Sequence, residues 1–272
     1  MKPFHINIII LLSIILFSCF VYSSYGLFSG ENTEKFEGSD VGELNPKNII
    51  GYIHVYQKGE WKKSYDMLMS SIKESGLYEN IKEIRLGVVS DDYSDSRSNK
   101  RSESANNPKI TEDYSNLMQD ERFNDKKIRI IYKGNAKEYE RPTLLHMKKS
   151  SYEDDDNTLY FYLHTKGIRW YGTKHEPKVL EWIESMLDCN IKNWENVINI
   201  LDEKETYGCN YNGGHYSGNF WWATAKHIQK LSDVIPEYYT APEDWVLTNK
   251  DNMYCYKNCE DDFVVPYDPE MY

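Results

Sequence analysis

The sequence lacks three widespread enzyme signatures: a G-x-x-x-x-G-K-[ST] phosphate loop, a G-x-S-x-G nucleophile elbow and an H-E-x-x-H zinc motif. Their absence argues against the commonest nucleotidases, esterases and zinc proteases. A basic stripe with interleaved aromatic residues is also missing, and the formal net charge is −11. Because an acidic chain repels phosphate backbones, we expect no nucleic-acid partner. A nucleotide ligand needs only a local positive group and stays compatible with this charge.

Cysteine is scarce, with five residues in 272. Cys19 lies in a hydrophobic N-terminal segment, and the others are Cys189, Cys209, Cys255 and Cys259. The last two are close enough in sequence to form a disulfide or to join a metal site. No second close pair or histidine partner gives zinc-ligand spacing, so ordinary buried thiols and a disulfide both remain open.

One long run without charge occupies residues 6–22, INIIILLSIILFSCFVY. A helix of this length, at about 1.5 Å per residue, just spans a hydrocarbon core of roughly 30 Å. Lys2 precedes the run and the next basic residue is Lys35. The positive-inside rule then predicts a single-pass membrane protein whose main domain lies on the non-cytosolic side.

Two alternatives to this anchor stay open. Ser23 and Ser24 are small residues that suit a cleaved signal peptide, which would give a secreted protein. The segment ending at Cys19 also resembles a bacterial lipoprotein signal, which would give a lipid anchor. We favour the uncleaved signal anchor.

The predicted organisation is a cytosolic N-terminus (1–5), a transmembrane anchor (6–23), a polar stem (24–47) and a catalytic α/β domain (48–272). Hydrophobic residues make up 40% of the chain, as in globular proteins. Residues 91–125 read as a long, partly disordered loop. Hydrophobic periodicity predicts strands at 48–57, 81–90, 127–132, 159–163, from 206 to 209 and at 220–222, and helices at 61–75, 141–149, 176–201, 224–231 and 242–249. The first strand, helix and strand suggest a parallel βαβ unit.

A polar segment follows the continuous apolar strand predicted at 159–163. It consists of His164, Thr165, Lys166 and Gly167. Ligands of open α/β sheets bind at the carboxyl ends of the strands, where these side chains can donate to an anion and the glycine lets backbone approach. The alternative is a strand end that happens to be polar.

Residues 213–222, GGHYSGNFWW, form a second candidate segment. The glycines mark a loop that bends or admits a ligand, and the candidate substrate-binding residues are His215, Ser217, Gly218, Asn219, Trp221 and Trp222. The alternative is a tight turn with core tryptophans. Because neighbours on a strand face opposite ways, one tryptophan could bind a ligand while the other lies in the core.

Two acidic segments complete the candidates. Pro242 starts a helix whose first turn holds Glu243 and Asp244, where the helix dipole favours a carboxylate by roughly 0.3–1 kcal/mol and keeps it ready as a base. Acids are also routine at helix starts. The run at 153–156 makes Asp154 and Asp156 candidate ligands for Mg²⁺ or Mn²⁺. It precedes its strand, at the opposite edge of the sheet, so we favour a solvated turn.

Together these segments resemble glycosyltransferases of the GT-A type, in particular viral and bacterial polysaccharide glycosyltransferases such as rhamnan-synthesis F-like proteins. Those carry a strand ending in H-T-K, then H-Y-S-G-N-F-W-W, then an acidic residue before an aromatic one in a late helix. The matching segments here are 164–166, 215–222 and 243–245. The resemblance covers roughly residues 49–247, and its most specific part is the longer string.

This resemblance implies a Rossmann-like, mostly parallel sheet, a nucleotide-sugar donor in the N-terminal half and an acceptor in the C-terminal half. The chain departs from most GT-A enzymes at their Asp-x-Asp metal motif, where it has the segment 164–166. We therefore expect no metal cofactor, although Mn²⁺ or Mg²⁺ stays open. Lys166 and His164 would stabilise the departing diphosphate in its place, and Glu243 or Asp244 would act as the base.

The leading hypothesis is a membrane-anchored glycosyltransferase, similar to hexosyltransferases, that moves a sugar from a nucleotide-sugar donor to a glycan or glycoconjugate acceptor. Two alternatives come from other classes. One is a non-catalytic carbohydrate-binding module of the same fold. The other is a metal-dependent hydrolase that uses the acidic run at 153–156.

Overall fold

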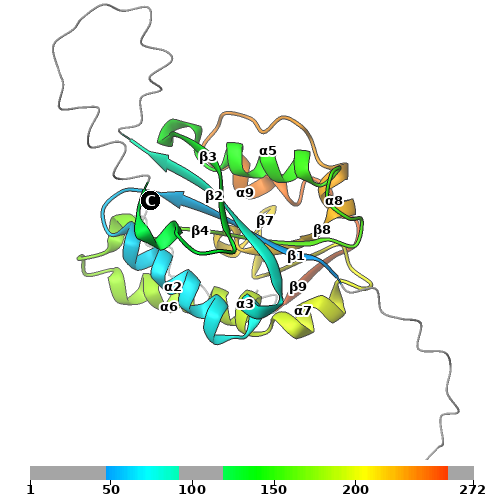
Figure 1. Ribbon diagram of the computed structural model, residues 1–272, viewed down its shortest axis with the longest axis horizontal. Helices are drawn as coiled ribbons and strands as arrows, with labels where there is room; N and C mark the ends of the chain where they lie inside the picture. The colour runs from blue at the N-terminus through cyan, green and yellow to red at the C-terminus, as the bar shows by residue number, and fades with distance from the viewer. Residues whose placement is uncertain (1–46, 92–118, 257–272) are drawn as a thin grey trace, which may run out of the picture. The chain divides into compact units, whose positions relative to one another are not determined.

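A mostly parallel seven-stranded sheet, in the order β3-β2-β1-β4-β8-β5-β9, forms the middle layer of the computed structural model (Figure 1). The structure describes residues 47–91 and 119–256. The strands are β1 (Ile49–Tyr56), β2 (Ile81–Ser90), β3 (Ile128–Asn135), β4 (Leu159–His164), β5 (Thr206–Cys209), β8 (Trp221–Thr224) and β9 (Met253–Tyr256). Only β8 in this sheet is antiparallel to its neighbours, β4 and β5. The mixed α/β class and the mostly parallel sheet agree with the sequence-based prediction.

Hydrophobic runs explain the two middle strands. Leu159–Leu163 of β4 are fully buried, as a strand covered on both faces requires, and β1 is buried over seven of its eight residues. β1 and β2 are parallel and are joined through α2 (Trp61–Glu74) and α3 (Leu77–Asn80), which confirms the predicted βαβ unit.

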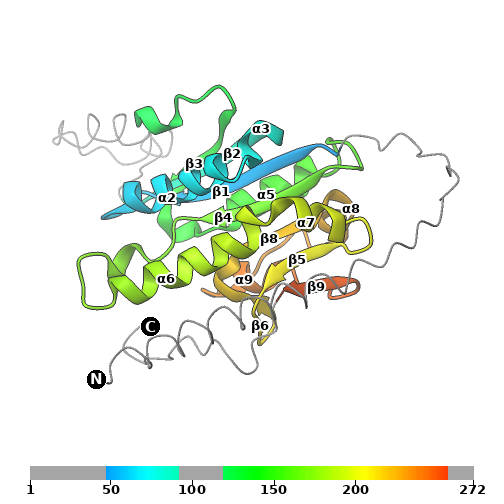
Figure 2. The same ribbon diagram turned by 90° about the horizontal axis from the view of Figure 1, so that it is seen from below.

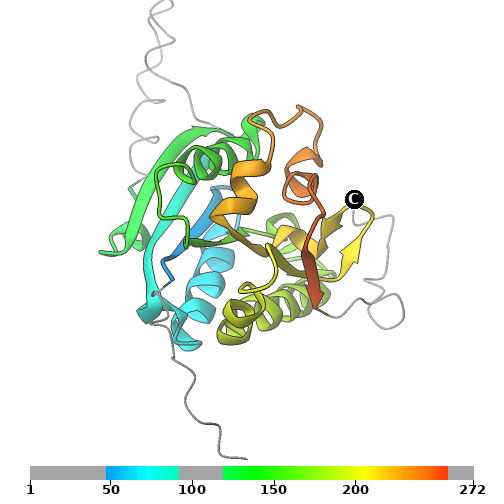
Figure 3. The ribbon, with the colours of Figure 1, turned by 90° about the vertical axis from the view of Figure 1, so that its right-hand side faces the viewer.

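Helices cover both faces of the sheet (Figure 3). One face carries α2 and α3 together with α6 (Glu176–Leu187) and α7 (Trp194–Ile200), which Figure 2 shows from their outer side. The other face carries α5 (Arg141–Ser150), α8 (Ala225–Lys230) and α9 (Ala241–Trp245). Trp222 packs in the core on the α2 face and Trp221 in the core on the α5 face, so the expected alternation of the two tryptophans is confirmed.

Several elements differ from the prediction. The helix expected at 176–201 is interrupted after α6 by a π-helical segment, Asp188–Lys192, before α7 begins. The Asn190 carbonyl in this segment accepts a hydrogen bond from the Trp222 indole at 2.8 Å. This irregular turn therefore satisfies a buried indole N–H that a regular helix would leave without that partner. The last helix is also shorter than expected, because α9 ends at Trp245.

Three short strands were not predicted: β9, and β6 (Tyr211–Asn212) with β7 (His215–Tyr216), which form a small hairpin. Short 3₁₀ turns lie at η2 (Glu121–Phe123), η3 (Ala136–Glu138), η4 (Ile168–Trp170) and η6 (Ser217–Asn219). The first of these falls inside the loop predicted at 91–125. Phe123 is buried there against Trp61 and Tyr65, so this end of the loop belongs to the core.

Three predictions lie wholly or largely outside the described residues: the anchor at 6–23, the stem at 24–47 and the middle of the loop at 91–125. Within residues 47–91 and 119–256, no helix combines the length and the apolar character needed to cross a bilayer. In the described part of the chain, Cys189 and Cys209 are buried and Cys255 is partly exposed. A pairing that involves Cys259 lies outside it.

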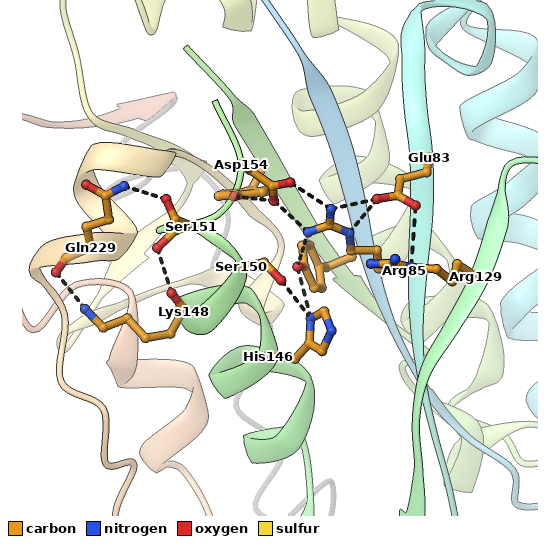
Figure 4. A network of polar contacts seen from close by, with 11 residues as sticks. Glu83, Arg85, Arg129, His146, Lys148, Ser150, Ser151, Asp154 and Gln229 are labelled. Atoms are coloured by element: carbon orange, nitrogen blue, oxygen red, sulfur yellow. Dashed lines mark hydrogen bonds and ion pairs between the residues drawn. The ribbon is translucent and has the colours of Figure 1, made fainter. Parts of the chain in front are cut away.

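The acidic run at 153–156 contains a buried ion pair (Figure 4). The Arg85 guanidinium on β2 donates to both carboxylate oxygens of Asp154, at 2.7 and 2.9 Å, and to the Tyr52 hydroxyl at 2.8 Å. Tyr160 donates to Asp154 at 2.9 Å. Burial alone would raise the pKa of Asp154, but these hydrogen bonds hold it below its usual value. The solvated turn is thus wrong for Asp154, which ties β2 to the start of β4, whereas Asp156 is exposed.

We expect Asp154→Asn to lower the free energy of unfolding by about 2–4 kcal/mol, because it leaves the buried Arg85 with a smaller share of opposite charge. Glu83, whose carboxylate lies 2.6 Å from the Arg85 guanidinium, keeps the cost from being larger. Denaturant unfolding measures the change. Asp156→Asn is the matched control and should shift stability by less than about 0.5 kcal/mol. Equal effects of the two variants would contradict a structural role for the ion pair.

Candidate functional site

The Glu140 carboxylate lies at the carboxyl edge of the parallel strands, immediately before α5. Two donors share its Oε2 atom: the Tyr162 hydroxyl and the Asn219 side-chain amide, each at 2.6 Å. His164 Nδ1 lies 3.8 Å from the other oxygen, Oε1. Glu140 therefore joins the end of β4 to the turn that precedes β8, and its side chain is only 15% exposed.

The Ser-Gly-Asn turn at 217–219 is shaped by left-handed backbone. Gly218 has φ 66°, and a Cβ atom there would lie 2.1 Å from the sulfur of Met186. Asn219 has φ 57°, which asparagine tolerates better than most residues. Its side-chain oxygen accepts from the Trp221 indole at 2.7 Å, so the amide nitrogen points to Glu140. Packing therefore fixes the position of Gly218, and hydrogen bonds fix that of Asn219.

His164 is held as a neutral group. Its Nε2–H donates to the Gly218 carbonyl at 2.9 Å. Burial, with the nearby charge of Lys166, lowers the pKa of His164 to about 3. Its imidazole is therefore uncharged near neutral pH and can act toward a leaving group only as a neutral hydrogen-bonding group, so the role of His164 beside the departing diphosphate stays a prediction. Lys166 remains the cation of this strand end.

Lys166 lies over an aromatic ring, with its Nζ 4.6 Å from the centroid of Trp182. The Trp182 indole in turn donates to Ser217 Oγ at 3.0 Å, which ties α6 to the turn at 217–219. Burial lowers the pKa of Lys166, while the charges of Glu243 and Glu140 act in the opposite direction. The ammonium is thus half-buried, backed by an indole and attracted by two carboxylates.

Glu243 and Asp244 stand in the first turn of α9, on either side of His215. The His215 ring nitrogens lie 3.8 Å from Glu243 Oε2 and 3.4 Å from Asp244 Oδ1. The charge of Glu243 reaches Tyr162, His164 and Lys166. Asp244 instead contacts the Tyr238 hydroxyl at 3.4 Å and is more exposed. Of the two acids, Glu243 faces the end of β4.

Several predicted binding residues have other roles. Thr165 is buried, and its hydroxyl accepts from the Tyr56 amide, which fastens β4 to β1. Gly167 has φ 72°, and a Cβ atom there would lie 2.3 Å from Val179, so it serves close packing against α6. Trp221 and Trp222 are both fully buried. Neither ring is available to a ligand, and the prediction that one of them binds substrate is wrong.

The residues in place of an Asp-x-Asp motif do not fit a divalent cation. Lys166 carries a positive charge there, and the Nε2–H of His164 is already donated to a carbonyl. The described ranges, 47–91 and 119–256, hold no group of three His, Cys, Asp or Glu side chains arranged to bind a metal ion. Asp154 and Asp156 precede β4 and lie at the opposite edge of the sheet from Lys166.

Sequence reasoning missed Glu140, Trp182 and Tyr239. Burial raises the pKa of the Tyr239 phenol, and the charges of Arg169, Glu243 and Glu140 also act on it, so this ring borders the site. The position of Glu140 in the sequence could have indicated that it belongs to the site. It lies between a predicted strand and the Pro-containing start of the next helix, a connection that reaches the same edge as residues 164–166.

The sequence matches no protein-family model and no curated protein. The site consists of a half-buried ammonium, a neutral histidine and two carboxylates at the carboxyl edge of a mostly parallel sheet.

A second buried histidine beneath the site predicts loss of stability in acid. His54 pairs with His164 across β1 and β4, and its Nδ1 lies 2.9 Å from the Thr143 hydroxyl. Burial lowers the pKa of His54 from 6.5 to about 4. Between these pH values the unfolded chain binds a proton that the folded protein does not. The free energy of unfolding therefore falls as pH falls, by up to about 1.4 kcal/mol per pH unit for this group.

Urea unfolding at several pH values between 4 and 6.5 measures this slope. We expect His54→Gln to reduce the slope, because it removes one group that titrates only after unfolding. His175→Gln is the control, since His175 lies at the partly exposed start of α6. An unchanged slope in His54→Gln would show that other groups cause the acid sensitivity.

Proposed function

We propose that the protein is a glycosyltransferase with a GT-A-like fold, which moves a sugar from a nucleotide-sugar donor to a glycan or glycoconjugate acceptor. The observation that carries this proposal is the placement of Lys166. Its ammonium is half-buried against Trp182 at the carboxyl edge of the sheet, where open α/β folds bind nucleotides. The H-T-K and H-Y-S-G-N-F-W-W resemblance supports the same reading.

The reaction needs positive charge where the donor's diphosphate departs. When the bond between the anomeric carbon and the phosphate oxygen breaks, its electron pair stays on that oxygen. A fixed cation in a partly desolvated site stabilises this charge strongly. Lys166 is suited to this role because the charges of Glu243 and Glu140 favour its ammonium form and oppose the effect of burial, which lowers its pKa.

The acceptor hydroxyl must lose a proton as it attacks the anomeric carbon. Glu243 is the better candidate for the base, because it faces the end of β4 and Lys166, whereas Asp244 contacts Tyr238. His215 lies between the two acids and would position Glu243. Glu140 is less suited, since one of its oxygens already accepts two hydrogen bonds.

The uncharged run at 6–22 adds the proposal that this enzyme is anchored in a membrane by one uncleaved helix, with its catalytic domain on the non-cytosolic side. A glycan or glycoconjugate acceptor at the membrane surface suits such a tether. Secretion or lipid anchoring at Cys19 remain the competing proposals.

A carbohydrate-binding module of the same fold is the second candidate. It would keep the pocket without turnover. Hydrolysis or transfer of a panel of nucleotide sugars by the purified protein separates the two, because a binding module consumes no donor. The metal-dependent hydrolase has lost support, since Asp154 is engaged by Arg85 and Tyr160 at the opposite edge.

We expect Lys166→Ala to lower kcat by about a hundredfold with a much smaller change in donor KM, because the charge matters most as the diphosphate departs. Lys166→Arg should restore activity only in part, since a planar guanidinium does not replace a compact ammonium. Steady-state kinetics with EDTA present and absent measure both effects. Lys178→Ala, at an exposed position of α6, is the control. Activity abolished by EDTA, restored by Mn²⁺ and indifferent to Lys166→Ala would contradict this role.

A second kinetic comparison concerns the base. Glu243→Gln should lower kcat for transfer by about 10²–10⁴-fold, the usual contribution of general-base catalysis. Asp244→Asn should cost less than about tenfold, because its effect reaches the acceptor only through His215. The ratio of the two losses, measured at saturating donor, is the decisive quantity. A larger loss in Asp244→Asn would reverse the assignment.

A further inference from the structure

A groove of about 560 Å³ opens beside the site, between the start of α5 and the connection from α8 to α9. Its lining includes Lys137, Glu138, Tyr139, Arg141 and Glu237. Two of these, Tyr139 and Arg141, are the immediate chain neighbours of Glu140. The groove is therefore lined by both chain neighbours of Glu140, the carboxylate at the end of β4.

One exposed aromatic ring, Tyr139, lines this groove, and a second, Tyr239, packs against it. The side chains of Tyr139 and Tyr239 are 39% and 64% exposed, and their rings meet edge to face with centroids 5.4 Å apart. Tyr139 also has φ 52° and ψ −143°, a backbone conformation that non-glycine residues rarely adopt. Strained residues of this kind cluster at ligand-binding sites.

Arg141 supplies an unused hydrogen-bond donor. Its guanidinium lies 5.2 Å from the centroid of the Tyr139 ring, and its Nη2 donates to the Glu237 carbonyl at 3.3 Å. Its Nη1 is buried and has no hydrogen-bond partner in the described structure. A buried donor without a partner is costly, so an oxygen atom of a ligand in the groove would satisfy it.

The charges of the groove indicate what kind of ligand fits. Lys137 and Arg141 are balanced by Glu138 and Glu237, so the lining carries no net charge. A site of this kind gives no electrostatic advantage to an anion or a cation. Flat apolar ring faces, carboxylates that accept from hydroxyl groups and a guanidinium that donates to oxygen suit an uncharged sugar.

The Tyr239 ring connects the groove residue Tyr139 with the surroundings of the proposed base. The Tyr239 phenol lies within the electrostatic reach of Glu140 and Glu243, and its neighbour Tyr238 contacts Asp244 at 3.4 Å. We propose that this groove binds an uncharged sugar unit of the acceptor, stacked on Tyr239 and hydrogen-bonded by Arg141 Nη1, and directs its hydroxyl toward Glu243. This inference rests on the proposed transferase function.

The test uses the full-length protein in a detergent without a sugar headgroup. Acceptors are neutral oligosaccharides of glucose, mannose, galactose and N-acetylglucosamine, beside matched uronic-acid oligomers. With the best neutral acceptor, Tyr239→Ala should raise the acceptor KM about tenfold, while the donor KM changes by less than about twofold. Arg141→Lys should also raise the acceptor KM, because a point charge does not reproduce the guanidinium fork. Tyr152→Ala removes a tyrosine of similar exposure (62%) from the opposite edge of the sheet and is the control.

Two results would overturn the proposal: an acceptor KM that neither Tyr239→Ala nor Arg141→Lys changes, or a preference for uronic-acid oligomers that weakens with added salt. If the wild-type protein consumes no donor, calorimetric titration with the same neutral oligosaccharides replaces the kinetics. Binding that Tyr239→Ala weakens would then support the groove while the transferase function fails. Binding that the substitution leaves unchanged, or no binding, would overturn the groove as well.

Discussion

The hydrogen bonds to the Glu140 carboxylate are the interaction on which the rest of the site depends. They connect three segments far apart in sequence: the start of α5, the end of β4 through Tyr162, and the turn before β8 through Asn219. Tyr162 and Asn219 are fully buried, and a buried polar group left without its partner costs about 1–3 kcal/mol. This cost fixes the turn at 217–219 against β4. The Gly218 carbonyl then meets His164, and Ser217 meets the indole that backs Lys166.

The two edges of the sheet differ in their polar side chains: one holds a buried ion pair and the other holds the candidate site. At the edge where β4 begins, the Asp154 carboxylate accepts hydrogen bonds from Arg85 and Tyr160 and serves to hold the strands together. At the edge where β4 ends, neighbouring side chains hold Lys166 and Glu243 in place. Their charged groups can still form hydrogen bonds to a ligand. The carboxyl edge of parallel strands is the usual place for ligands in such folds. In this protein the ion-paired side chains lie at the amino edge, and the polar side chains of the candidate site lie at the carboxyl edge.

Local patterns predicted the elements well where one strand or helix carries its own signal. The apolar run at 159–163 is buried on both sides, and the alternation of Trp221 and Trp222 follows from strand geometry. What the sequence could not predict depends on partners far along the chain. Glu140 acquires its role only because Asn219, 79 residues away, reaches it. The tryptophans resembled ligand-binding rings but fill the core, whereas the exposed ring of Tyr239 lies in a segment with no distinctive pattern.

The connection from α8 to α9 carries Glu237, Tyr238 and Tyr239 outside the sheet, whereas Lys166 follows directly from the middle strand β4. Substitutions at Glu237, Tyr238 and Tyr239 change exposed side chains and disturb no strand pairing. The part of the molecule that would choose the acceptor can thus drift during evolution without altering the part that would break the donor bond. In the proposed transferase, a change of acceptor would therefore need substitutions only in this surface connection, and β4 with Lys166 would stay as it is.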